Sequence, residues 1–201
     1  MRHYEQLLES YNNHAGDREK MTLTGWKENE RIRFLERLNK GARLLDLGAG
    51  TGEHGAFFLR NGVDVTCGDF SPAMVSACRK KWLKAEVVDF YSLKTDRPFD
   101  AVWSMNALLH VPKADLGLAL ENIRGVLVSD GLFYLGLYGG EDSEGVWDSD
   151  PYEPKRFFSF HTETGIREAV QPYFDVLEYR YTALEKGPDY HALMLRKREE
   201  S

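Results

Sequence analysis

The twelve residues LLDLGAGTGEHG, numbers 44–55, contain four glycines directly after a short apolar run. This stretch fits two different glycine patterns. Counted from Gly50 it reads G-x-G-x-x-G, the pattern with which dinucleotide-binding folds hold a pyrophosphate at the start of a helix. Counted from Asp46 it reads D-x-G-x-G-x-G. The choice between these patterns decides which ligand we expect the chain to bind.

Short apolar runs alternate with segments of helical spacing through the middle of the chain. The strand-like runs are 42–47, 63–68, 85–90, 99–104 and 131–138. The helix-like segments are 52–61, 71–81, 91–96 and 113–127, and Ser71 followed by Pro72 is a typical helix start. This alternation predicts βαβ units, and therefore a parallel sheet covered by helices on both faces.

The two ends of the chain depart from this alternation. Two helices are expected near the N-terminus, over 3–13 and 25–39. Near the C-terminus, a helix over 162–171 is followed by two strand-like segments, 174–184 and 190–197. Because Gly187 and Pro188 supply turn residues between them, these segments predict an antiparallel hairpin that completes the sheet.

Two carboxylates in the opening stretch favour one of the two glycine patterns. Asp46 lies at the end of an apolar strand, where an unpaired charge is costly. Glu53 falls in the first turn of the next helix, where a carboxylate repels a bound phosphate. Both acids suit a ligand that is cationic at this end, so the pattern from Asp46 is preferred and Gly55 is interpreted as a chance glycine.

The preferred pattern resembles motif I of class I S-adenosylmethionine-dependent methyltransferases. Acids also end the next two strand-like runs, as Asp69-Phe70 and Asp89-Phe90, and the fourth run ends in Ser104-Met105-Asn106. The order of these elements from about residue 40 to 140 is similar to that family. The resemblance implies S-adenosylmethionine as cofactor, bound by Asp46, Gly48, Ala49, Gly50, Gly52, Asp69, Phe70, Met74, Asp89, Phe90, Ser104 and Met105. It also implies an α/β fold, a Rossmann-like three-layer sandwich around a seven-stranded, mostly parallel sheet of order 3-2-1-4-5-7-6 with the last strand antiparallel.

Methyl transfer from a sulfonium is an in-line displacement, which requires positioning and needs a base only when the nucleophile is protonated. The candidate catalytic residues are His110, Tyr138 and His161, which follow predicted strands or precede a helix. The segment 139–162 is longer than an ordinary connection and predicts a substrate-side loop. The candidate substrate contacts are Trp147, Tyr152, Arg156 and Phe157 from this loop, and Tyr11 from an N-terminal helix that we expect to close over the cofactor. The six acids between Glu141 and Glu153 indicate either a cationic substrate or a solvated surface.

The chain length predicts one domain, 1–201, divided into a helical cap (1–40), a cofactor-binding core (41–138), the loop (139–162) and a C-terminal helix with hairpin (163–201). A net charge of −6 argues against a nucleic-acid substrate, and no apolar run is long enough to span a membrane. With two cysteines, no secretory signal and no metal-binding pattern, we expect a cytoplasmic monomer or homodimer that acts on a small molecule. Two alternatives stay open: a protein that binds S-adenosylmethionine without catalysis, and an NAD(P)-dependent oxidoreductase.

Overall fold

The structure is a computed structural model that describes residues 2–21, 25–185 and 187–199. The outer limits of the predicted cap and C-terminal regions, and residue 186 before the predicted turn, lie outside the described residues. None of the described helices is both long enough and apolar enough to cross a membrane.

A seven-stranded sheet forms the centre of the molecule, in the order β3-β2-β1-β4-β5-β9-β8. Its strands are β1 (Arg43–Leu47), β2 (Asp64–Asp69), β3 (Lys84–Val87), β4 (Phe99–Met105), β5 (Leu127–Gly139), β8 (Phe174–Thr182) and β9 (Asp189–Lys197). The first five pair in parallel, and β9 runs antiparallel to both of its neighbours. Numbered within this sheet alone, the order is 3-2-1-4-5-7-6, which confirms the expected topology.

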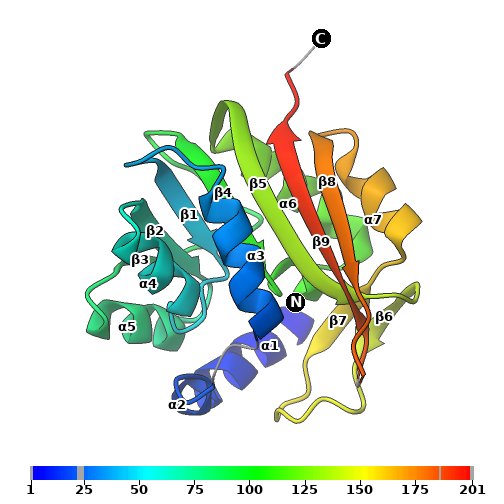
Figure 1. The fold of residues 1–201 in the computed structure, drawn as a ribbon. Coiled ribbons are helices and arrows are strands. Elements are labelled where there is room, and N and C mark those ends of the chain that lie inside the picture. Colours follow the sequence, from blue (N-terminus) through cyan, green and yellow to red (C-terminus); the bar gives the residue numbers. More distant parts are fainter. Residues whose placement is uncertain (1, 22–24, 186, 200–201) are drawn as a thin grey trace.

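Helices cover both faces of the sheet, because the buried strands are apolar on both sides. On one face lie α3 (Gly25–Leu35), α4 (Glu53–Arg60) and α5 (Pro72–Lys80), whose buried side chains join the same core cluster as β1 and β2. On the other lie α6 (Lys113–Gly125) and α7 (Glu163–Val170). This is the predicted three-layer sandwich (Figure 1).

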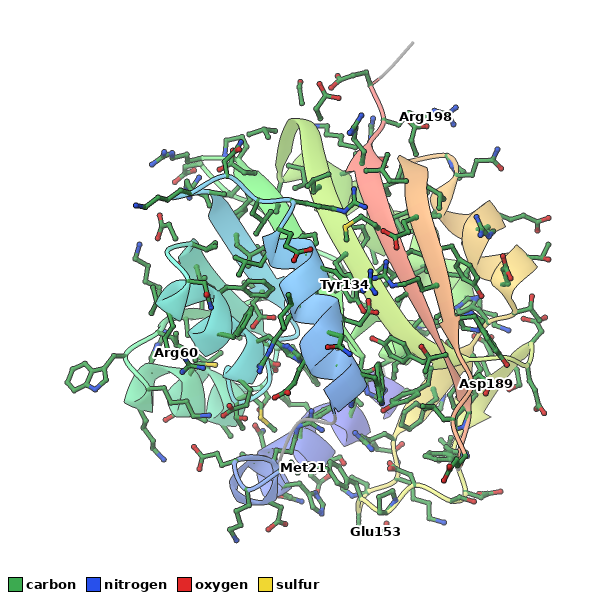
Figure 2. The ribbon with its side chains drawn as sticks, in the orientation of Figure 1. Met21, Arg60, Tyr134, Glu153, Asp189 and Arg198 are labelled. Atoms are coloured by element: carbon green, nitrogen blue, oxygen red, sulfur yellow. The ribbon has the colours of Figure 1, made fainter. Side chains whose placement is uncertain are left out.

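The remaining elements gather at one end of the sheet, where the parallel strands end (Figure 1). They are α1 (Arg2–Asn13), α2 (Ala15–Arg18), the short helix η1 (Leu108–His110) and the antiparallel pair of β6 (Ser143–Val146) and β7 (Phe157–Phe160). Figure 2 shows the labelled Met21 and Glu153 at this end and Arg198 at the opposite end. We call residues 2–18 and 143–160 the covering segments.

Three local predictions were wrong. Residues 91–96 are not helical, because Thr95 forms side-chain hydrogen bonds with the backbone of Arg97, which compete with helix formation. The third strand ends at Val87, so Asp89 lies in the loop that follows. The segment predicted as a loop, 139–162, contains the β6–β7 pair. The sequence of β7, FFSF, does not alternate between apolar and polar residues, so it gave no strand signal.

Candidate active site

The glycine-rich loop connects β1 to α4 through a tight turn. Gly48 has φ +76°, and a Cβ at this position would lie 2.2 Å from the Cβ of Ala107. Only glycine fits this conformation and this space. A Cβ on Gly55 would lie 2.5 Å from the sulfur of Cys67 in β2. Gly55 is therefore required for close packing of α4 on the sheet, and its interpretation as a chance residue was wrong.

Asp69, at the end of β2, is bonded to the backbone of this loop. Its two carboxylate oxygens accept hydrogen bonds from the amides of Gly50, at 2.8 Å, and Ser71, at 2.9 Å. Burial raises the pKa of Asp69 to about 6, although the two amides act in the opposite direction. The carboxylate thus occupies the Gly50 amide, one of the donors that a pyrophosphate on this loop would need.

Asp46 lies beneath the glycine-rich loop. It is almost fully buried, and one of its carboxylate oxygens has no hydrogen-bond partner in the described part of the chain. Burial raises its pKa to about 7, the Gly55 amide opposes this shift, and the nearby charge of Asp69 adds to it. Asp46 is placed next to the loop, but it does not line either of the two cavities described next.

The first cavity, of about 60 Å³, runs along the ends of β1, β2 and β4. Seven of the residues expected to bind the cofactor line it: Gly48, Gly50, Asp69, Phe70, Asp89, Phe90 and Met105. Three others lie behind its wall: Gly52 caps α4, Met74 packs against Leu7 and Tyr11, and Ser104 is fully buried. The cavity therefore joins the acids that end β2 and follow β3.

Helix α1 covers this first cavity with Tyr4, Leu7 and Tyr11. Burial, together with the nearby carboxylate of Asp89, raises the pKa of the Tyr4 phenol. Asp89 is itself held in place by the amide of Tyr91, at 2.9 Å. Except for Tyr11, sequence reasoning missed these contacts, because the surface helix α1 carries no motif.

The second cavity is larger, about 470 Å³, and adjoins the first. Five residues line both: Tyr11, Arg18, Gly50, Asn106 and His110. The wall of the second cavity also includes five residues of the sequence prediction, namely Ala49, Tyr138, Trp147, Tyr152 and Arg156. Its volume lies within the range of small-molecule sites.

Two candidate residues lie away from both cavities. The ring of Phe157 packs against His3, with 5.1 Å between ring centroids, and its neighbours Phe158 and Phe160 line the second cavity instead. Side chains alternate along β7, which is why positions 158 and 160 share one side. His161 is buried beyond the end of β7, where burial and Lys113 lower its pKa to about 4.

A chain of hydrogen bonds joins the covering segments where the cavities meet. Nδ1 of His110 donates to the carbonyl oxygen of Phe157 at 2.7 Å, so Nε2 is the acceptor for the Tyr11 hydroxyl, also at 2.7 Å. Arg156 donates to the Tyr11 oxygen at 3.1 Å. Two further nitrogens of Arg156 donate to the carboxylate of Asp150, which is fully buried in this ion pair.

This arrangement determines what His110 can do. Burial, and then the positive charge of Arg156, lower the pKa of His110 to about 3. The imidazole is therefore neutral at physiological pH and is a weak base. Its geometry instead suits it to position the hydroxyl of Tyr11.

Three residues of the candidate site were given no role from the sequence. Asn106 follows β4 with φ +59°, and its buried side-chain oxygen has no partner in the described part of the chain. A non-glycine residue in this conformation often marks a functional site. Arg18 and Lys27 line the second cavity, and within the described residues neither forms an ion pair. The sequence placed Asn106 with Ser104 and Met105 at the end of the fourth strand, and that position was the available signal.

Comparison with protein families supports this interpretation of the loop. Residues 44–131 match a family model described as a methyltransferase domain. The matched part contains the glycine-rich loop, Asp69, Asp89, Asn106 and His110. The comparison with curated proteins found no match.

Solved structures show the same fold over almost the whole chain. A Burkholderia thailandensis 1,6-didemethyltoxoflavin-N1-methyltransferase, bound to 1,6-didemethyltoxoflavin and S-adenosylhomocysteine, is 20% identical with a TM-score of 0.76, covering 98% of this chain and 90% of that one. A Methanosarcina mazei S-adenosylmethionine-dependent methyltransferase is 17% identical with a TM-score of 0.74, covering 90% and 100%. The [4+2]-cyclase SpnF is 18% identical with a TM-score of 0.73, covering 89% and 83%. Residues 44–131 are thus similar to a methyltransferase domain, and the chain has the fold of solved S-adenosylmethionine-dependent methyltransferases.

Proposed function

We propose that this protein transfers a methyl group from S-adenosylmethionine to a small molecule bound in the second cavity. One observation carries the choice of cofactor: the Gly50 amide already donates to Asp69, at 2.8 Å. A pyrophosphate at this position would lose that donor and meet a carboxylate instead. A ligand with ribose hydroxyls and no phosphate fits the same residues, since Asp69 has capacity to accept further hydrogen bonds.

The residues of the first cavity suit the separate parts of this cofactor. Asp69 would accept from the ribose hydroxyls, and Asp89 with Phe90 would hold the adenine ring. Gly48 leaves the backbone open to close approach. Arg18 lies over the loop, with Nε 3.8 Å from where a Cβ of Gly50 would be, and would pair with the carboxylate of the methionine part.

The junction of the two cavities is where we place the transfer. When bound, S-adenosylmethionine supplies an electrophilic methyl group. The chain then needs to hold a nucleophile in line with that methyl and to keep water away from it. Tyr11, Asn106 and His110 line both cavities at this junction, and residues of both covering segments form part of the cavity walls.

The second cavity supports a small-molecule acceptor. Aromatic side chains form much of its wall, and its volume of about 470 Å³ suits a compact ligand. The Burkholderia thailandensis methyltransferase of the same fold is bound to 1,6-didemethyltoxoflavin. None of the six acids between Glu141 and Glu153 lines the cavity, which removes their support for a cationic substrate.

A second candidate function is binding of the cofactor without methyl transfer. The observation in its favour is that a [4+2]-cyclase has the same fold, so the fold by itself does not require methyl transfer. The low pKa of His110 also leaves the junction without a strong base.

The deciding experiment offers S-adenosylmethionine with an isotopically labelled methyl group, and a panel of phenols, heteroaromatic N–H compounds, amines, thiols and carboxylates. We expect labelled product from one class of acceptor. The variant Asp69→Asn should lose most of this activity, whereas Asp96→Asn, an exposed acid outside both cavities, should keep it. Cofactor binding without any labelled product would favour the second candidate.

A further inference from the structure

Two cations of the site have no carboxylate partner among the residues that the structure describes. Within the described residues, neither Arg18 nor Lys27 takes part in an ion pair, although both line the second cavity. The other charged residues of the wall are matched, since Arg156 pairs with Asp150 and Glu53 pairs with Lys81. The cavity therefore carries excess positive charge, which favours anionic ligand groups.

The two unpaired cations lie in different places. Arg18 lines both cavities and lies over Gly50, which suits the carboxylate of the cofactor. Lys27 lines only the second cavity, and its ammonium group lies 5.6 Å from the ring centroid of Tyr138. If Arg18 binds the carboxylate of the cofactor, Lys27 is the remaining unpaired cation of the second cavity that the acceptor substrate can contact.

Much of the wall of the second cavity is aromatic. Phe158 and Phe160 are stacked with 5.6 Å between ring centroids, and Trp147 meets Phe158 edge to face at 5.3 Å. All three line the second cavity, as does Tyr138. Such a wall binds flat rings by stacking and by edge contacts.

The histidines of the cavity do not provide a base. Burial lowers the pKa of His54 to about 3, as it does that of His110. Neither histidine therefore removes a proton from the acceptor readily at neutral pH, so the site suits an acceptor that is already nucleophilic.

We propose that the acceptor substrate is a planar aromatic anion, with its rings against Trp147 and Phe158 and its negative charge beside Lys27. The inference rests on the proposed function. In the transfer, a lone pair of the acceptor forms the bond to the methyl carbon, the carbon–sulfur bond breaks, and its electron pair stays on sulfur. The sulfonium becomes a neutral thioether, the acceptor loses one negative charge, and the protein takes up no proton.

The test titrates three planar probes of equal size into the full chain saturated with S-adenosylhomocysteine, by isothermal calorimetry. The probes are 2-naphthoate, 2-naphthamide and 2-naphthylmethylammonium. We expect 2-naphthoate to bind at least about tenfold more tightly than the amide, since a charge-assisted contact is gained, and the ammonium to bind most weakly. Equal or tighter binding of the amide or the ammonium, or no binding of 2-naphthoate at millimolar concentration, would overturn the proposal.

Three variants test whether Lys27 contacts the negative charge of the bound probe. Lys27→Met should weaken 2-naphthoate by about tenfold and leave 2-naphthamide unchanged, and Lys27→Arg should restore the binding of the anion. Lys80→Met, at an exposed lysine in the last turn of α5, is the control and should change neither. An equal loss for both probes, or a loss of S-adenosylhomocysteine binding in Lys27→Met, would overturn the role of Lys27.

The cofactor titration separates this inference from the proposed function. If the wild-type chain binds S-adenosylhomocysteine and the naphthalene probes show no charge preference, only the substrate class fails. If S-adenosylhomocysteine does not bind, the proposed function itself fails.

Discussion

The glycine-rich loop and the covering segments form opposite sides of one site, and they are built in different ways. In the loop, the contacts are local: Asp69 binds the amides of Gly50 and Ser71, nineteen and two residues away. On the covering side, Tyr11 binds His110 and Arg156, which are 99 and 145 residues away. The loop side is determined by the backbone conformation of a short stretch of sequence. The covering side depends on contacts between side chains that are far apart in the sequence and meet only after folding.

This difference has a consequence for mutation. Changes in the loop act on backbone strain and close packing, so they should affect the stability of the whole fold. Changes on the covering side remove individual side-chain contacts, so their effects should be smaller. Variants on the two sides can therefore be compared, and we expect the losses of stability to be larger in the loop than in the covering segments.

The largest effect should come from Gly48→Ala. The new Cβ would lie 2.2 Å from the Cβ of Ala107, and φ is +76°. Steric overlap and backbone strain together should lower the free energy of unfolding by about 5 kcal/mol. Urea denaturation measures this. Gly62→Ala is the matched control, with φ +83° and, among the described residues, no atom within 4 Å of the new Cβ. Equal losses in both variants would show that crowding at Gly48 is not the cause.

The next effect concerns pH and Asp46. In the folded protein the pKa of Asp46 is about 7, above its ordinary value. Its contribution to the free energy of unfolding is therefore fully present below the ordinary pKa of an aspartate, and it is lost as the pH rises through 7. Asp46→Asn stays neutral at every pH. Urea denaturation without cofactor measures the free energy of unfolding of the variant and of the wild type at pH 4 and at pH 8. The difference, variant minus wild type, should be on the order of 4 kcal/mol larger at pH 8 than at pH 4. Asp96→Asn, at an exposed acid, should show no such gain. A pH-independent difference for Asp46→Asn would contradict the assigned pKa.

On the covering side, Asp150→Asn should cost about 3 kcal/mol, because Arg156 would keep a buried charge without its partner. Burial tends to raise the pKa of Asp150, but the hydrogen bonds from Arg156 outweigh it and lower the pKa. The wild type should therefore lose this contribution only as the pH falls below the usual range of an aspartate. Asp142→Asn, at an exposed acid that directly precedes this covering segment and pairs with Lys113, should cost much less. Similar losses would mean that the Asp150–Arg156 pair is no more important than a surface pair.

The smallest effect should come from Tyr11→Phe. The change keeps the ring, removes the hydroxyl and leaves Nε2 of His110 without its donor. We expect a loss of about 1 kcal/mol in the free energy of unfolding. Tyr181→Phe, at an exposed tyrosine of β8, is the control. A loss as large as that of Gly48→Ala would contradict the contrast between the two sides.

Much of the fold follows from the sequence. The alternation of apolar runs and helical segments predicted the parallel sheet, and Ser71 and Pro72 begin α5 as expected, with the Ser71 hydroxyl accepting from the Met74 amide at 3.2 Å. These signals are local in the chain. The β6–β7 pair was missed because Trp147 to Arg156 separate its strands, and no short turn marks them as partners.

The site was predicted unevenly for the same reason. Gly48, Gly50, Asp69 and Asp89 line the first cavity, and each lies within a few residues of the end of a strand. Arg18 and Lys27 reach the site only through the packing of separate helices against it, which no spacing in the sequence reveals. The position of Phe157 outside the cavities likewise depends on the direction of alternation along β7.

The central claim is that Asp69 and the glycine-rich loop bind S-adenosylmethionine and not a dinucleotide. The most direct test is calorimetric titration of S-adenosylhomocysteine and of NAD into the wild type and into Asp69→Asn. We predict that S-adenosylhomocysteine binds to the wild type, that NAD does not, and that Asp69→Asn weakens S-adenosylhomocysteine by at least about tenfold. Binding of NAD alone, or unchanged affinity in Asp69→Asn, would contradict the claim.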